Sequence, residues 1–262
     1  MDLQIETLTQ SISSLAIDTR NTKSYYESKI VQIITIQKWF RGCLTRLKRL
    51  PLVMYSIQRY LASQSLQCSK LNEDGRLNSC TDEDTIIILL ITKFGIKIKK
   101  PKIRMWYDIL AYDYLYGWIP INIKTTTTLT SDNTGNLAMC VYAYTDELLD
   151  IHRDKTYENG KMSVILYDKL RTGKYNTAPK KDYYFLVVNK TNPKDIIINS
   201  VKGLTALTPN INNLPFQVCW NKNRTFKYEN INKKIKLFIN CLQKPKPSWK
   251  ETFMSNIRTL DL

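Results

Sequence analysis

Three polar residues, Asp108, Asn122 and Lys124, lie in or beside two β-prone runs of the chain. The turn signal Tyr116-Gly117 separates the runs, which are therefore predicted to pair as adjacent strands. Such pairing would place the acid and the lysine at one end of a sheet. A carboxylate can hold a hard divalent cation such as Mg²⁺, and a lysine beside it can orient water or stabilise charge on a phosphate. These residue types suit the hydrolysis of a phosphodiester.

A further carboxylate comes from the segment before these strands. Glu83 falls in the first turn of a helix predicted from Asp82 to about Phe94, where the helix dipole favours acids. Gly95 is predicted to end this helix. Glu83 can therefore supply a second negative charge to a site built around Asp108.

This set of residues resembles the core of the PD-(D/E)XK nucleases, in which a helix acid, a strand Asp and a D/E-x-K strand converge. The likeness covers about residues 75–225. Residues 104–109 and 118–126 resemble type II restriction endonucleases that carry a PVNIK-like strand, with Asp132-Asn133 in the polar loop that follows. Residues 181–188 and 213–218 resemble later segments of the same enzymes.

The resemblance implies a metal-dependent endonuclease that hydrolyses double-stranded DNA. Asp108 and Glu83 would hold Mg²⁺, and Asn122 would offer a neutral contact. Lys124 would orient water or stabilise the pentavalent phosphorus. Type II enzymes are often homodimers on palindromic sites, so the resemblance also implies a homodimer.

Asn122 departs from the family pattern, because an amide stands where a second acid is usual. Three accounts are open: Glu83 supplies the missing charge, Asp113 substitutes from nearby, or the core is inactive and only binds DNA. Without the resemblance, the spacing of Asp108 and Lys124 would favour a surface ion pair on adjacent strands, which contributes little energy.

The charge balance predicts a polyanionic partner. Thirty-nine Lys and Arg against 23 Asp and Glu give a formal charge of +16, as in proteins that bind nucleic acid through phosphate contacts. The candidate DNA-binding residues are Lys99, Lys100, Lys102 and Arg104 before the site, Lys174 beside Lys169 and Lys181 around a Gly-containing loop, and Asn221 and Arg224 after Trp220. A solvated strand edge, a flexible loop and a polar turn are the respective alternatives.

A second motif lies nearer the N-terminus. Residues 36–46 fit the pattern IQxxxRGxxxR, with Ile36, Gln37, Arg41, Gly42 and Arg46 at its defining positions. It resembles the IQ motif, a basic amphipathic helix that calmodulin-like EF-hand proteins bind. The competing function is therefore a non-catalytic DNA-binding or structural adaptor for such a partner. The alternative for the motif itself is an ordinary packing helix whose basic face is solvated or touches DNA.

Strands interleaved with helices predict an α/β or α+β core. The resemblance favours the α/β class with a mixed central sheet flanked by helices, restriction-endonuclease-like, and a helical arm is predicted before it. Residues 1–24 are predicted to be a mobile tail, 25–66 the helical arm and 67–262 the core, with the polar segment 67–81 as the boundary. The other predicted elements are helices over 25–50, 52–66, 137–151 and 232–242, and strands over 162–167, 182–188 and 195–200.

Other functional classes find little support. The six cysteines form no CxxC pair, His152 is the only histidine, and neither GxGxxG nor GxxxxGK[ST] occurs. The N-terminus lacks a signal-peptide pattern and the longest apolar run, Ile86 to Ile91, is too short to span a bilayer. An intracellular protein that is neither secreted nor membrane-bound is expected. Heavy use of Ile, Lys, Asn and Tyr is typical of AT-rich genomes, such as those of large DNA viruses.

Overall fold

The structure is a computed structural model that describes residues 24–38, 49–69, 75–102, 105–134, 136–153, 155–175, 181–210, 214–242 and 249–260. The chain divides into two compact units, Met1–Lys48 and Arg49–Leu262. In the first unit, residues 24–38 form a helix, as predicted. Residues 39–48 of the predicted helix lie outside the described residues, and residues 49 and 50 are not helical. The boundary predicted between residues 66 and 67 falls inside the second unit.

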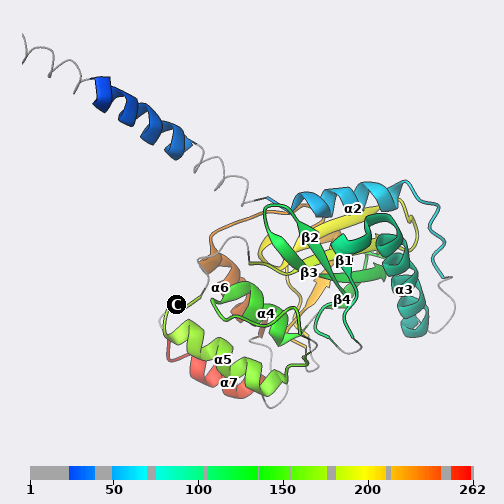
Figure 1. The fold of residues 1–262 in the computed structure, drawn as a ribbon. Helices are drawn as coiled ribbons and strands as arrows, with labels where there is room; N and C mark the ends of the chain where they lie inside the picture. The colour runs from blue at the N-terminus through cyan, green and yellow to red at the C-terminus, as the bar shows by residue number, and fades with distance from the viewer. Residues whose placement is uncertain are drawn as a thin grey trace, which may run out of the picture. The chain divides into compact units, whose positions relative to one another are not determined.

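The second unit is built on a five-stranded mixed sheet (Figure 1). Its strands are β1 (Ile98–Lys99), β2 (Ile109–Asp113), β3 (Gly117–Thr126), β5 (Tyr184–Asn189) and β6 (Ile196–Ser200), in the order β1-β2-β3-β5-β6. Strands β3 and β5 are parallel, and the other pairs are antiparallel. The predicted pairing of the two adjacent strands is therefore confirmed, and so are the two later strands. A small sheet pairs β4 (Ser131–Asn133) with β7 (Gln217–Cys219).

Helices cover both faces of the large sheet. On one face, α2 (Leu52–Ala62) and α3 (Gly75–Phe94) pack in one apolar cluster with residues of β2 and β3. On the other face, α4 (Leu137–Tyr144), α5 (Asn159–Arg171), α6 (Ile231–Leu242) and α7 (Trp249–Ile257) gather in a second cluster (Figure 1). Short 3₁₀ turns occur at Gly95–Lys97, Val201–Gly203 and Trp220–Asn223. The predicted α/β class with a flanked mixed sheet is confirmed.

Three helix boundaries differ from the predictions. Helix α3 begins at Gly75 rather than Asp82, so its acids lie within the helix and not in its first turn. Helix α4 ends at Tyr144 rather than Ile151, because Thr145 is extended and turns its hydroxyl back to the carbonyl of Val141 at 2.7 Å. Helix α2 ends at Ala62, four residues before the predicted end.

The strand predicted over 162–167 is wrong, because these residues belong to α5. Met162, Leu166 and Leu170 are buried at a spacing of four residues, whereas Val164 is 67% exposed. A strand would turn Val164 and Leu166 to the same face, and a helix turns them to opposite sides. The short apolar run was compatible with either structure until the packing of the whole segment was known.

This difference can be measured. Leu166→Ala should lower the free energy of unfolding by about 2–5 kcal/mol, because it leaves a cavity in the helical layer. Val164→Ala should change it by no more than about 0.5 kcal/mol. Urea denaturation of both variants checks the assignment, and equal losses at the two positions would contradict the helix.

Candidate active site

Asp108 and Asn122 meet where β2 begins. The register pairs Ile109 with Ile121, so Asp108 lies opposite Asn122. The Asp108 N–H donates to the carbonyl of Ile121 at 3.0 Å. Its carboxylate oxygen Oδ2 accepts hydrogen bonds from the Ile123 N–H at 2.7 Å and from Nδ2 of Asn122 at 2.9 Å. The Asp108 carboxylate is therefore fixed in direction by β3.

Glu83 and Lys124 meet beside this carboxylate. The Lys124 ammonium lies 3.7 Å from Oε1 of Glu83, and both side chains are mostly buried. Helix α3 packs on the sheet through Ile86, Ile87 and Leu90. Glu83 precedes Ile87 by one helical turn and shares its side of the helix. The packing of α3 on the sheet thus places Glu83 beside Lys124 of β3.

A cavity of about 440 Å³ opens over the two carboxylates. Its lining residues are Cys80, Glu83, Asp84, Ile87, Lys100, Pro101, Lys102, Met105, Tyr107 and Asp108. Asn122 and Lys124 are not among these residues, and they contact Asp108 and Glu83 from the strand beneath. The cavity therefore combines three acids, Glu83, Asp84 and Asp108, with two lysines from the segment after β1.

Burial dominates the electrostatics of both acids. It raises the pKa of Glu83 to about 7, with a further increase from Asp108 and an opposing decrease from Lys124. Burial also raises the pKa of Asp108, and Lys124 and the Ile123 N–H oppose it. Lys124 thus opposes the effect of burial on both carboxylates, and Lys190 adds a smaller effect on Glu83.

The residues present fit a magnesium ion. The amide oxygen Oδ1 of Asn122 is buried and has no hydrogen-bond partner, so a lone acceptor remains beside the Asp108 carboxylate. Mg²⁺ is commonly held by one or two carboxylates with water completing its shell. Asp108 and Glu83 could provide the charged ligands and Asn122 a neutral one. Within the described ranges, no group of three or more His, Cys, Asp or Glu gathers as a metal site.

Asp113 does not substitute for the missing acid. It lies at the far end of β2, opposite Gly117. Its Oδ2 accepts from the N–H of Val53 at 3.0 Å, and its Oδ1 accepts from two N–H groups of the turn that follows β2. Asp113 therefore joins α2 to the hairpin turn, and this account of Asn122 is excluded.

Two further charged residues near the site, Lys190 and Asp132, were not predicted as site residues. Lys190 follows β5, and its buried ammonium lies 3.5 Å from Oδ2 of Asp82. Asp132 accepts a hydrogen bond from the Thr126 hydroxyl at 3.0 Å, and burial raises its pKa while Lys124 and Lys190 lower it. Because β5 runs parallel to β3, their ends meet. Only Asp132 had a sequence signal, its place in the polar loop.

Only some of the predicted DNA-binding residues lie at the cavity. Lys100 and Lys102 line the cavity, although Lys100 also pairs with Asp84 at 2.7 Å. Lys99 lies over the ring of Trp118 at 4.1 Å. Lys174 is exposed, and Arg104 lies outside the described residues.

The candidate DNA-binding residues Asn221 and Arg224 are hydrogen-bonded to each other. The Arg224 guanidinium donates to Oδ1 of Asn221 at 2.9 Å and to Asp195 at 2.5 Å. Asn221 also accepts a hydrogen bond from Thr128. This arrangement agrees with the polar-turn alternative for these two residues.

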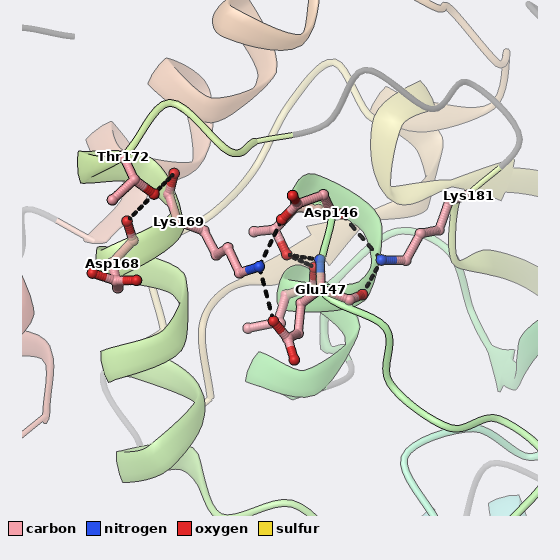
Figure 2. A network of polar contacts seen from close by, with 8 residues as sticks. Asp146, Glu147, Asp168, Lys169, Thr172 and Lys181 are labelled. Atoms are coloured by element: carbon pink, nitrogen blue, oxygen red, sulfur yellow. Dashed lines mark hydrogen bonds and ion pairs between the residues drawn. The ribbon is translucent and has the colours of Figure 1, made fainter.

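Two lysines of the predicted basic loop stabilise the fold instead. Lys169 bridges Asp146 at 2.8 Å and Glu147 at 3.0 Å, as Figure 2 shows. Lys181 donates to the backbone carbonyls of Thr145 and Glu147. These contacts join α5 and the start of β5 to the end of α4.

The IQ-type residues are only partly described. Ile36 and Gln37 lie in the helix over 24–38, where Ile36 is exposed. Arg41, Gly42 and Arg46 lie outside the described residues.

Comparison with protein-family models, with curated proteins and with solved structures gives no match. Along the described part of the chain, no helix is both long enough and apolar enough to cross a membrane.

The raised pKa of Glu83 predicts a pH dependence of stability. The folded state favours the protonated acid, so it binds more protons than the unfolded chain between pH 4.5 and about 7. Stability should fall as pH rises through this window, by on the order of 3 kcal/mol. Glu83→Gln, which mimics the neutral acid, should remove this part of the dependence.

Thermal unfolding midpoints measured across this pH range check the expectation. Glu158→Gln, a change at an exposed acid of α5's N-terminus, is the matched control and should follow the wild-type curve. Parallel curves for wild type and Glu83→Gln would contradict the assigned ionisation.

Proposed function

We propose that the protein is a metal-dependent endonuclease of the type II restriction kind that hydrolyses DNA phosphodiesters. One observation carries the proposal: a helix acid, Glu83, and a strand acid, Asp108, reach one cavity while Lys124 lies 3.7 Å from the first of them. The PD-(D/E)XK resemblance requires this convergence. Carboxylates on opposite faces of the fold would have opposed it.

Each residue has a role that follows from its contacts. Asp108 and Glu83 would hold Mg²⁺, directly or through water, and Asn122 would offer its unpartnered amide oxygen. The bound ion would stabilise charge on the phosphate and lower the pKa of a water molecule. Lys124 would orient the attacking water or stabilise the pentavalent phosphorus. The hydrogen bonds from Ile123 and Asn122 keep Asp108 in place throughout.

The charges around the cavity suit a phosphate backbone. From residue 85 to residue 107 the sequence contains six Lys or Arg and no Asp or Glu. Lys100 and Lys102 of this segment line the cavity. Phosphate contacts of this kind supply most non-specific DNA affinity. DNA is therefore the substrate that the surroundings of the two acids favour.

Of the accounts of Asn122, the supply of the missing negative charge by Glu83 agrees best with the structure. Asp108 raises the pKa of Glu83 and Lys124 lowers it, so the Glu83 carboxylate interacts with both of these residues. An inactive, DNA-binding core is the remaining account, and cleavage assays separate the two.

We expect purified protein to cut mixed-sequence duplex DNA into discrete fragments at low salt with Mg²⁺. Lys124→Ala should lower the cleavage rate by about 10²–10³-fold, because one positioned charge on the reacting phosphate is lost. Asp108→Ala and chelation with EDTA should abolish cleavage. Lys233→Ala, at an exposed lysine of α6, is the matched control and should cut normally.

Asn122→Asp tests the departure from the family pattern. A carboxylate there should lower the Mg²⁺ concentration needed for cleavage, and it should destabilise the metal-free protein by removing the hydrogen bond to Asp108. Wild-type protein that retains DNA in a salt-sensitive manner without cutting it would refute the enzyme and favour the inactive core.

A second candidate function is an adaptor for a calmodulin-like EF-hand protein. Its support is the helix over 24–38, which exposes a row of large apolar side chains. These are Tyr25, Tyr26, Ile30, Val31, Ile33, Ile34 and Ile36, each at least 43% exposed. The sequence from residue 28 to residue 72 contains no acid, which suits an acidic groove.

Binding of purified calmodulin, with and without Ca²⁺, tests this candidate. The double substitution Ile36→Ala with Gln37→Ala should abolish binding, because it removes the first two residues of the motif. Val31→Ala, at an exposed position of the same helix before the motif, should reduce binding less. Equal binding by wild type and the double variant would reject the motif.

A further inference from the structure

The turn between α3 and β1 holds an apolar side chain in solvent. Ile96 is 91% exposed, more than any other large hydrophobic side chain in the described ranges. It lies in the 3₁₀ turn Gly95–Lys97, and Gly95 has a φ of +55°, a conformation that glycine adopts readily. The chain therefore reverses sharply at this point and leaves Ile96 at its tip.

The residues on both sides of the tip are anchored. Phe94 packs edge-to-face against Tyr60 of α2, with ring centroids 5.8 Å apart. Ile98, two residues after the tip, is 5% exposed and belongs to the core between α2, α3 and the sheet. Ile96 therefore projects from a rigid base, because its neighbours are fixed in the core.

Lysines surround the tip. Lys97 is exposed beside Ile96, and Lys93 and Lys99 lie over the rings of Tyr60 and Trp118. No acid occurs between residues 85 and 107. Lys100, which lines the cavity over the two carboxylates, follows four residues after Ile96. Four residues span at most about 14 Å, which is about four base-pair steps of duplex DNA.

We propose that Ile96 is a wedge that inserts between stacked base pairs of duplex DNA, while Lys97 and its neighbours contact the adjacent phosphates. The inference rests on the proposed nuclease function, for which it names a duplex-deforming contact. Apolar side chains that enter a base step in this way kink and unstack the duplex. A kink within a few steps of the cavity would turn the backbone toward Glu83 and Asp108.

Other partners suit this tip less well. A single isoleucine buries little area in a bilayer, and stable membrane anchoring requires much more apolar contact. A second copy of the chain would bring lysines against lysines. Duplex DNA alone combines an apolar gap between bases with phosphates on both sides.

Fluorescence of 2-aminopurine in mixed-sequence duplex DNA tests the wedge, with EDTA present to prevent cleavage. Wild-type binding should raise the fluorescence, because unstacked 2-aminopurine emits more strongly. Ile96→Ala should lose most of this rise and bind the duplex about tenfold more weakly. Lys97→Ala should weaken binding and reduce the slope of log K against log salt by about one.

Leu148→Ala is the matched control, because Leu148 is 86% exposed but lies in the acidic segment 146–150. It should behave as wild type. Unchanged fluorescence and affinity in Ile96→Ala would overturn the wedge. So would Ile96-dependent binding to phosphatidylserine vesicles without any Ile96-dependent binding to DNA, which would identify a membrane surface as the partner.

The wedge and the enzyme can fail separately. If wild type and Ile96→Ala cut DNA equally well with Mg²⁺ and unstack it equally, the wedge fails and the nuclease stands. If wild type unstacks DNA through Ile96 but never cuts it, the nuclease fails and the wedge stands. If wild-type protein does not bind duplex DNA at low salt, both are overturned.

Discussion

The site depends on one hydrogen bond, from the Ile123 N–H to the carboxylate of Asp108 at 2.7 Å. Strand β3 continues beyond the start of β2, so this N–H faces the edge where no β2 residue pairs with it. Asp108 fills that place with its side chain, while its own N–H continues the ladder to Ile121. Because a buried N–H without a partner is costly, the end of the hairpin and the position of the acid are fixed together.

Burial of the two carboxylates makes their charged forms less stable. Burial raises the pKa of both Glu83 and Asp108, and Lys124 partly compensates for both. An acid at position 122 would add a third carboxylate against Asp108, whereas Asn122 donates a hydrogen bond to it. The amide thus stabilises the metal-free fold and weakens the site as a cation ligand. Functional sites commonly keep such local costs within an otherwise consistent fold.

The large positive charge is divided between the fold and the surface. Lys202, Lys234 and Lys250 are buried and donate to the backbone carbonyls of Lys181, Leu204 and Asn210 at 2.5–2.7 Å. Such lysines satisfy carbonyls that would otherwise lack donors in the interior. The net charge of the chain is therefore larger than the positive charge exposed at its surface. Lys100 and Lys102 line the cavity, and Lys97 is exposed beside Ile96.

The sequence by itself determined the elements with long, regular patterns: the hairpin of β2 and β3, strands β5 and β6, and helix α6. It also identified Glu83, Asp108 and Lys124 as candidate site residues, because their residue types and order suit phosphodiester hydrolysis. Only the tertiary structure decided that 162–167 is helical, that Asp113 serves the hairpin turn and that Lys190 lies beside Asp82. Local periodicity cannot separate a short buried strand from one face of a helix. Contacts between distant residues, such as those that place Lys190 at the end of β3, are set by the pairing of strands and leave no local pattern.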